Sequence, residues 1–282
     1  MNNGPPPARR AVISIAASAM KNVQWSGIHG KGRLEFKDNR ELEQYYEDKY
    51  SHGGYEGGGC VIFDINLSRL FHEARHRSAL GFLQPGADDV VLDAGCGDGS
   101  LSAKIAPRCR TVHAIDIAGN ALDPALRGVP HLQFHKMNVE ELAFADGFFD
   151  RIVSGETLEH LLDPRKAIAE FHRTLKPGGC LVVTYPTVNR TFMQRIQRRL
   201  GIGWHLEISE HLPEWTYGDV VKNVVAGGFE FVASEGRAVV GGVFGWIKYK
   251  SRFFARLFTR LSLGIRCFPR NSSFVSVLFR RK

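Results

Sequence analysis

The segment from Gly155 to Pro164 holds the side chains best suited to acid, base or metal chemistry. In a first helical turn, Glu156, Glu159 and His160 fall at positions i, i+3 and i+4 and share one face. His211 opens a later helical segment and can offer a second imidazole over the same pocket. These four side chains can bind a hard divalent cation and leave two octahedral positions for adjacent oxygens of a bound molecule.

A metal-free interpretation of the same group stays open beside the metal site. In it, His160 is a general base, and Glu156 and His211 complete the catalytic set. A third interpretation gives the group a structural role, because charged side chains also orient loops.

A glycine-rich loop provides the second candidate site. The apolar run Val90–Leu92 predicts a buried strand, which ends at Asp93 and is followed by glycines at alternate positions, Gly95, Gly97 and Gly99. Glycine lets backbone N–H groups approach a ligand closely, next to the positive end of the following helix. The loop lacks the last glycine of the G-x-G-x-x-G pattern, which argues against a dehydrogenase.

Three further strands are predicted after this loop. The first ends at Asp116, about 20 residues past the loop, where a carboxylate can accept both hydroxyls of a ribose. Asn138 follows the next strand, and the third runs from Phe149 to Gly155. Parallel strands of such a sheet bind ligands at their carboxyl ends, so these residues are expected at one edge.

The run from Val90 to Pro186 resembles the class I S-adenosylmethionine-dependent methyltransferases. Its landmarks, in order, are the Asp93–Gly99 loop, Asp116, Phe149-Asp150 and Leu175–Gly179. The resemblance implies an α/β fold, with a Rossmann-like seven-stranded and mostly parallel sheet, one antiparallel strand, and helices on both faces.

The same resemblance implies which residues bind the donor, S-adenosylmethionine. They are Asp93, Gly95, Gly97 and Gly99 at the methionine end, Asp116 with Ile117 at the ribose, Asn138 and Val139 at the adenine, and Gly155 beside the transferred methyl group. The family usually has Asp where Asn138 stands. The amide oxygen of Asn can still accept from the adenine amino group, without charge.

Two narrower resemblances concern the acceptor. Residues 148 to 190 resemble the ubiquinone-pathway O-methyltransferases, and E-x-x-E-H with His211 before Glu214-Trp215-Thr216 resembles the small-RNA 3′-terminal 2′-O-methyltransferases. Both families act on neighbouring hydroxyls, and Mg²⁺ is the implied metal. We expect O-methylation of a hydroxylated small molecule or of a glycan or lipid-linked intermediate, with an RNA 3′-terminal ribose as the alternative. No (Asp/Asn/Ser)-Pro-Pro-(Tyr/Phe) motif follows the fourth strand, which disfavours methylation of a base amino group.

The chain of 282 residues is long enough for one large domain with appendages. We expect an N-terminal arm and lid helix over residues 1–60, a methyltransferase core over 61–236, a basic helical insertion over 237–273 and a closing strand over 274–282. The lid helix, residues 38 to 50, carries Tyr45, Tyr46 and Tyr50. The helix from Ser68 to Leu83 carries a mixed-charge face, which we expect to be solvated; its residues are His72, Glu73, Arg75, His76 and Arg77.

The formal net charge of +8 is concentrated at the C-terminal end. From Gly236 to Lys282 there are eleven Lys and Arg and no Asp or Glu. A helix over residues 244–263 would carry an aromatic stripe opposite a basic one, which favours peripheral contact with an anionic membrane over RNA binding or packing on its own core. The Ala- and Ser-rich start is a poor signal peptide, so we expect a cytoplasmic protein.

Overall fold

The computed structural model describes residues 23–24, 35–51, 61–62, 65–187, 212, 215–237, 266–267, 272 and 274–282. Its main sheet has the strand order β10-β9-β11-β8-β7-β4-β5-β6. A small antiparallel sheet joins β1 (Val23–Gln24), β2 (Val61–Ile62) and β3 (Ile65–Asn66). Of the predicted N-terminal arm and lid helix (1–60), residues 23–24 and 35–51 are described, whereas the predicted basic helix (244–263) lies outside the described residues.

The main sheet confirms the predicted seven-stranded, mostly parallel fold. Strands β4 (Val90–Ala94), β5 (Thr111–Asp116), β6 (Leu132–Lys136), β7 (Phe149–Gly155) and β8 (Leu175–Pro186) pair in parallel. Strand β11 (Phe274–Arg281) lies antiparallel between β8 and β9 (Phe229–Arg237). The two-residue β10 (Arg266–Cys267) adds an eighth, outer strand.

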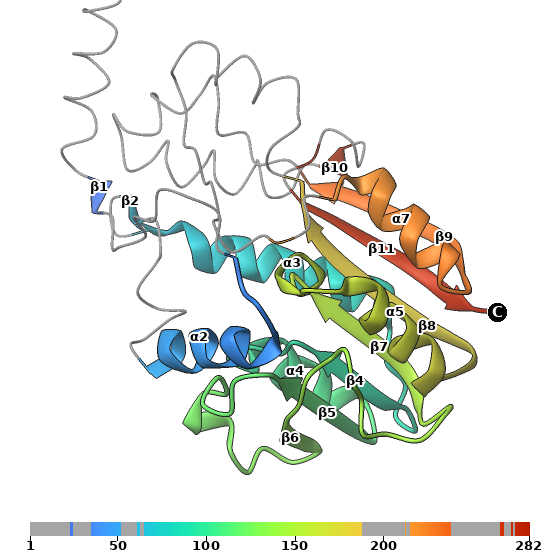
Figure 1. Cartoon of the computed structure of the whole chain (residues 1–282), viewed down its shortest axis with the longest axis horizontal. Helices are drawn as coiled ribbons and strands as arrows, with labels where there is room; N and C mark the ends of the chain where they lie inside the picture. Colours follow the sequence, from blue (N-terminus) through green and yellow to red (C-terminus); the bar gives the residue numbers. More distant parts are fainter. Residues whose placement is uncertain are drawn as a thin grey trace, which may run out of the picture.

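Helices cover both faces of this sheet (Figure 1). On one face, α3 (Leu67–Leu83) and α4 (Ser100–Ile105) bury Ala79, Leu83 and Leu101 against Val91 and Val153. On the other face, α5 (Pro164–Thr174) and α7 (Tyr217–Ala226) bury apolar side chains against the strands. Their buried residues are Ala167, Ile168, Phe171, Val220 and Val224. A remaining helix, α2 (Asn39–Ser51), lies by the carboxyl ends of β5 and β6.

Local sequence signals explain where the helices begin. Asp163 accepts a hydrogen bond from the backbone N–H of Arg165, 3.1 Å, and Pro164 occupies the first position of α5. Thr216 and Asp219 form a reciprocal capping box at the start of α7. Both helices are therefore fixed at their N-terminal ends.

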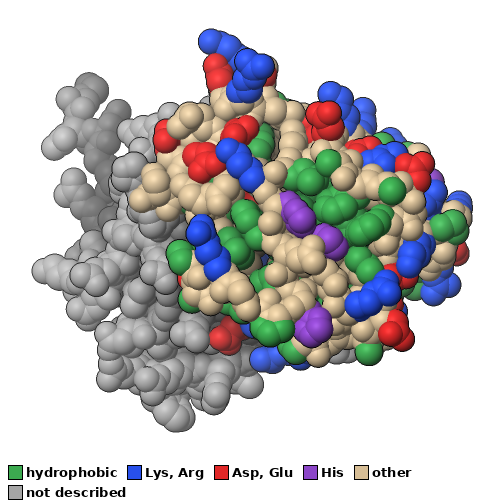
Figure 2. Space-filling model, turned by 90° about the horizontal axis from the view of Figure 1, so that it is seen from below, with side chains coloured by type: hydrophobic (Ala, Val, Ile, Leu, Met, Phe, Trp, Pro, Cys, Tyr) green, Lys and Arg blue, Asp and Glu red, His purple; other side chains and the backbone are tan. Residues whose placement is uncertain are grey.

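On the face viewed in Figure 2, basic and acidic side chains lie interspersed. Of the eleven basic residues between Gly236 and Lys282, six lie outside the described residues. The described helices include none with both the length and the apolar character needed to cross a bilayer.

Candidate active site

The glycine loop after β4 forms a tight cradle at the carboxyl edge of the sheet. Gly95, Gly97 and Gly99 all have positive φ, at 76°, 53° and 79°. The N–H groups of Gly95 and Cys96 both donate to the carbonyl of Ile115, at 2.9 Å each. A Cβ at Gly95 would lie 2.4 Å from the side chain of Thr157. The loop therefore needs glycine both for its backbone angles and for its closeness to the segment after β7.

Asp93, the fourth residue of β4, is buried beneath this cradle. Its Oδ2 accepts a hydrogen bond of 2.5 Å from the hydroxyl of Ser102 on α4. Burial raises the pKa of Asp93 to about 7, and the Ser102 hydrogen bond opposes that shift. A cationic ligand in the cradle would stabilise the charged form of this carboxylate.

Asp116 ends β5 beside the same loop. Its two oxygens accept from the backbone N–H groups of Gly97, at 2.9 Å, and Ala118, at 3.1 Å. Burial raises the pKa of Asp116 to about 6, while these N–H groups oppose the shift. A carboxylate has about four acceptor positions, so Asp116 can shape the loop and still accept from a ligand diol.

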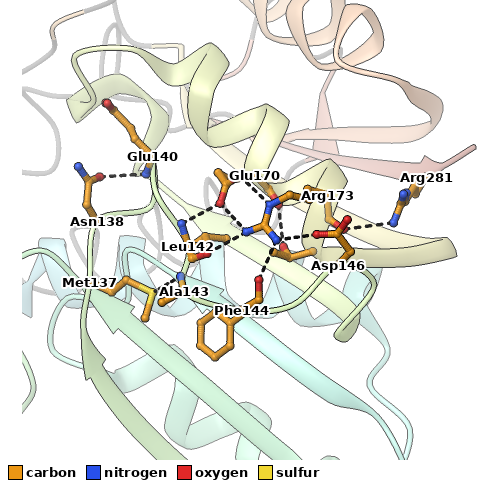
Figure 3. A network of polar contacts seen from close by, with 11 residues as sticks. Met137, Asn138, Glu140, Leu142, Ala143, Phe144, Asp146, Glu170, Arg173 and Arg281 are labelled. Carbon is orange, nitrogen blue, oxygen red and sulfur yellow. Dashed lines mark hydrogen bonds and ion pairs between the residues drawn. The ribbon is translucent and has the colours of Figure 1, made fainter.

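Asn138 and Ile117 line a pocket between the sheet edge and α2. The other residues that line it are Asn39, Arg40 and Glu43 of α2, with Lys136 and Met137. The amide oxygen of Asn138 accepts the N–H of Glu140 at 2.9 Å, which uses one of its two acceptor positions (Figure 3). Val139 is buried in the core, so its side chain supports this wall from behind.

Arg173 of α5 fixes the loop that carries Asn138 (Figure 3). Its guanidinium donates to the carbonyls of Leu142 and Phe144, at 2.8 Å each, and pairs with Glu170 and Asp146. Glu170 in turn accepts the N–H of Leu142, at 2.8 Å. The loop between β6 and β7 is thus held by the side chains of Arg173 and Glu170 on α5.

The segment after β7 departs from the predicted helical turn. Glu156 has a φ of +55°, which a right-handed helix does not permit. The segment forms a short 3₁₀ turn over Leu158–His160. The two carboxylates nevertheless interact, since the negative charge of Glu156 helps to raise the pKa of Glu159. A positive φ in a residue other than glycine is strained, and such strain is concentrated at functional sites.

Glu159 is buried and Glu156 is partly buried, and both have carboxylate oxygens that are buried without a hydrogen-bond partner. Oε2 of Glu156 pairs with Nη1 of Arg75 at 2.7 Å. Oε1 of Glu156 and both oxygens of Glu159 have no hydrogen-bond partner among the described residues. Burial raises the pKa of Glu159 well above its ordinary value, with the negative charge of Glu156 as the second cause.

The imidazoles of the predicted set are placed differently. The ring of His160 meets the ring of Tyr46 on α2 edge-on, with centroids 6.1 Å apart. His211 lies outside the described residues. Within the described part of the chain, no group of three or more His, Cys, Asp and Glu is placed to hold a metal ion. The structure thus brings together the two carboxylates of the predicted set.

The expectation that the charged face of α3 is solvated is confirmed for Arg77, which is exposed, and is wrong for His72, Arg75 and His76. His72, Arg75 and His76 line the same pocket as Asp93, Gly95 and Glu156. Arg75 donates to Nδ1 of His72 at 2.8 Å, and burial, followed by the charge of Arg75, lowers the pKa of His72 to about 3. These residues lie on the same face of the helix as the buried Ala79 and Leu83. The helical spacing could have indicated this, but charged side chains are usually expected to face solvent.

Comparison with known proteins agrees with this geometry. A family model of the methyltransferase domain matches residues 92–183. The ubiquinone biosynthesis O-methyltransferase of Albidiferax ferrireducens is 36% identical over 186 residues, which cover 64% of this chain and 69% of that protein. Its counterpart in Paracidovorax citrulli is 38% identical over 159 residues, which cover 54% of this chain and 63% of that protein.

A solved structure shows the same fold. The S-adenosylmethionine-dependent methyltransferase of Mesorhizobium loti superposes with a TM-score of 0.54 at 17% identity, over 75% of this chain and 100% of that one. The chain belongs to the class I S-adenosylmethionine-dependent methyltransferases. It is an enzyme of that class, and S-adenosylmethionine is its methyl donor.

Proposed function

We propose that this enzyme methylates a hydroxyl oxygen on the ring of a quinone precursor that carries two neighbouring hydroxyls. Two relatives are named as ubiquinone biosynthesis O-methyltransferases, and a Chlorobaculum parvum relative, 33% identical over 131 residues, is named demethylmenaquinone methyltransferase. The observation that carries the proposal is the pair Glu156 and Glu159, which follows Gly155 at the donor cradle and has three buried carboxylate oxygens without a hydrogen-bond partner among the described residues. Glycan and RNA 3′-end acceptors stay predictions.

The donor fits the edge of the sheet with its methionine end in the cradle. We assign the methionine part to Asp93 and the loop glycines, the ribose to Asp116 and Ile117, and the adenine to Asn138 and Val139. The guanidinium of Arg75 already pairs with Glu156, and its remaining N–H groups on the wall of the cradle can donate to a carboxylate of the donor. Gly155 then lies beside the methyl group, at the start of the acceptor side.

The unpartnered oxygens of Glu156 and Glu159 fit a divalent cation, because Mg²⁺ prefers carboxylate oxygens as ligands. When bound, such a cation would lower the pKa of the acceptor hydroxyl and orient the two neighbouring oxygens. His211 would complete this set from outside the described residues. His160, beside Tyr46, lines the acceptor side and would receive the hydroxyl proton if no metal is used.

The transfer itself needs positioning more than covalent help. The acceptor oxygen attacks the donor methyl carbon in line, the bond between carbon and sulfur breaks, and the demethylated donor leaves as a neutral thioether. The acceptor proton goes to a base or to solvent. Holding donor and acceptor in a fixed geometry can supply much of the rate enhancement for such a bimolecular step.

Methyl transfer to matched acceptors tests this function. The enzyme is incubated with S-adenosylmethionine and either a dihydroxylated aromatic ring or its monohydroxylated analogue, and the products are measured by mass spectrometry. We expect methylation of the dihydroxylated ring, loss of turnover in chelator and recovery with Mg²⁺. Equal turnover of both rings in the presence of chelator would overturn the metal-assisted mechanism.

We further propose that residues 244–263 bind anionic membrane surfaces from the cytoplasmic side. The support is the sequence pattern of aromatic and basic stripes. Full-length enzyme should sediment with anionic vesicles at low salt and much less at high salt. Equal sedimentation with neutral and anionic vesicles would remove this proposal.

A further inference from the structure

Helix α2 is joined to the donor edge of the sheet through one carboxylate, Glu47. Its Oε1 accepts the backbone N–H of Gly119 at 2.8 Å, and Nζ of Lys136 lies 3.0 Å from the same oxygen. Lys136 also pairs with Glu43, one helical turn earlier, at 2.6 Å. The side-chain amide of Asn120 donates to the carbonyl oxygen of Glu47 at 2.9 Å. Side chain and backbone of Glu47 thus both contact the loop after β5.

These contacts surround the place assigned to the adenosine of the donor. Gly119 lies three residues after Asp116. Lys136 lies opposite Asp116 in the register of β5 and β6. On the inner side, Asn39, Arg40 and Glu43 of α2 complete the pocket that Ile117 and Asn138 begin. Without α2, this pocket would have the sheet edge as its wall and solvent opposite.

The charge of Glu47 is retained at neutral pH. Its pKa is lowered, first by the N–H of Gly119 and then by Lys136. The ion pairs with Lys136 are partly exposed, so each contributes little alone, whereas a hydrogen bond from N–H to an ionised carboxylate is stronger and more directional. The bond to Gly119 is therefore the main contact, and Lys136 holds the carboxylate in place for it.

We propose that Glu47 is a positioning residue for donor binding, which places α2 as the second wall of the adenosine pocket. The proposal rests on the donor placement given above. The neighbouring residue Tyr46 contacts His160 at the acceptor side, so the same helix contacts both halves of the site. A donor that fills the pocket and a helix that closes it then stabilise each other.

Affinity for S-adenosylhomocysteine, measured by calorimetry on the full-length enzyme, tests this role. We expect Glu47→Ala to weaken binding about tenfold, the effect of losing one charge-assisted hydrogen bond, and Lys136→Met to weaken it less. Glu41→Gln is the matched control, because Glu41 lies on the same helix and pairs with the exposed Lys37. The control should bind like the wild type.

Hydrogen exchange separates positioning from a structural role. S-adenosylhomocysteine should protect the amides of α2 in the wild type and in Glu41→Gln, but not in Glu47→Ala, at saturating ligand. Affinity of Glu47→Ala within twofold of the wild type, or equal protection of α2, would overturn the proposal. This test involves no acceptor, so it is independent of the proposed reaction. Should Asp116→Asn also leave affinity unchanged, the donor placement itself would be wrong.

Discussion

The proposed donor half and the proposed acceptor half of the site satisfy their buried charges in opposite ways. Asp93 and Asp116 are both buried, and each accepts hydrogen bonds from Ser102 or from the N–H groups of the cradle. Glu159 is more deeply buried than either, and neither of its oxygens has a partner among the described residues. The carboxylates of the donor half already accept hydrogen bonds from the protein, whereas Glu159 in the acceptor half has oxygens available for a ligand.

This difference separates binding from chemistry. A cradle whose loop is fixed by its own hydrogen bonds can bind the donor with little rearrangement, which preserves affinity. Unpartnered buried carboxylate oxygens are costly, and they become useful only when a cation, a proton or a hydroxyl reaches them. Substitutions in the donor half should therefore change affinity for the donor, and substitutions in the acceptor half should change turnover.

The largest effect is expected for Glu156→Gln and Glu159→Gln. Both replacements keep the shape of the side chain and remove the charge that would act on the acceptor, so turnover should fall by about 100-fold or more. Affinity for S-adenosylhomocysteine should stay within threefold of the wild type. Glu141→Gln, on the exposed surface, is the control. If donor affinity falls as much as turnover, the two halves are not separate.

The next effect is expected for Asp116→Asn. Loss of its charge weakens the hydrogen bonds to the ribose diol, at about 1.5–3 kcal/mol for each charged bond. Affinity for S-adenosylhomocysteine, measured by calorimetry, should fall by about 10- to 100-fold. Asp123→Asn is the control, since Asp123 caps an exposed turn. Unchanged affinity of Asp116→Asn would remove Asp116 from the donor site.

A change of pH should act on donor affinity through Asp93 and Asp116. In the free chain, burial raises the pKa of Asp93 to about 7 and that of Asp116 to about 6. Both groups bind protons below these values, and the cationic donor favours their charged forms. Donor affinity should therefore rise between pH 5 and pH 8, by at most about tenfold for each pH unit and each proton released. In Asp93→Asn the rise should be smaller and should end near pH 6.

The smallest effect is expected at the far end of β7. Asp150 pairs with Lys176 at 2.6 Å and accepts the N–H of Val90 at 2.9 Å. The side chain of Lys176 is 43% exposed, so Lys176→Met should cost less than about 1 kcal/mol of unfolding free energy. Turnover and donor affinity should stay unchanged. A loss of activity would mean that the ends of β7 are coupled.

The fold and the donor half could be predicted from short local patterns. A buried strand, a glycine loop and an acidic residue at the next strand end follow one another in the chain, so the sequence alone is enough to place Asp93 and Asp116 beside the loop. Their role in donor binding stays a prediction. Long-range contacts could not be found in this way. The pairing of Arg75 with Glu156 spans 81 positions, and the contact of Glu47 with Gly119 spans 72.

The acceptor half was harder to predict, because it depends on unusual backbone angles. The spacing of Glu156, Glu159 and His160 indicated a helical turn, whereas the positive φ of Glu156 turns the chain before the 3₁₀ segment begins. The ring of His160 then lies against Tyr46. The charges of α3 also concealed a buried stripe, since a charged side chain can line a pocket as well as face solvent.

Binding of Mn²⁺ in place of Mg²⁺ tests the division between the two halves most directly. Mn²⁺ is titrated by paramagnetic resonance into the enzyme saturated with S-adenosylhomocysteine. We expect one tight Mn²⁺ site in the wild type and in Asp116→Asn, and its loss in Glu156→Gln and in Glu159→Gln. Equal Mn²⁺ binding by the wild type and both glutamine variants, or no Mn²⁺ binding by any of them, would contradict it.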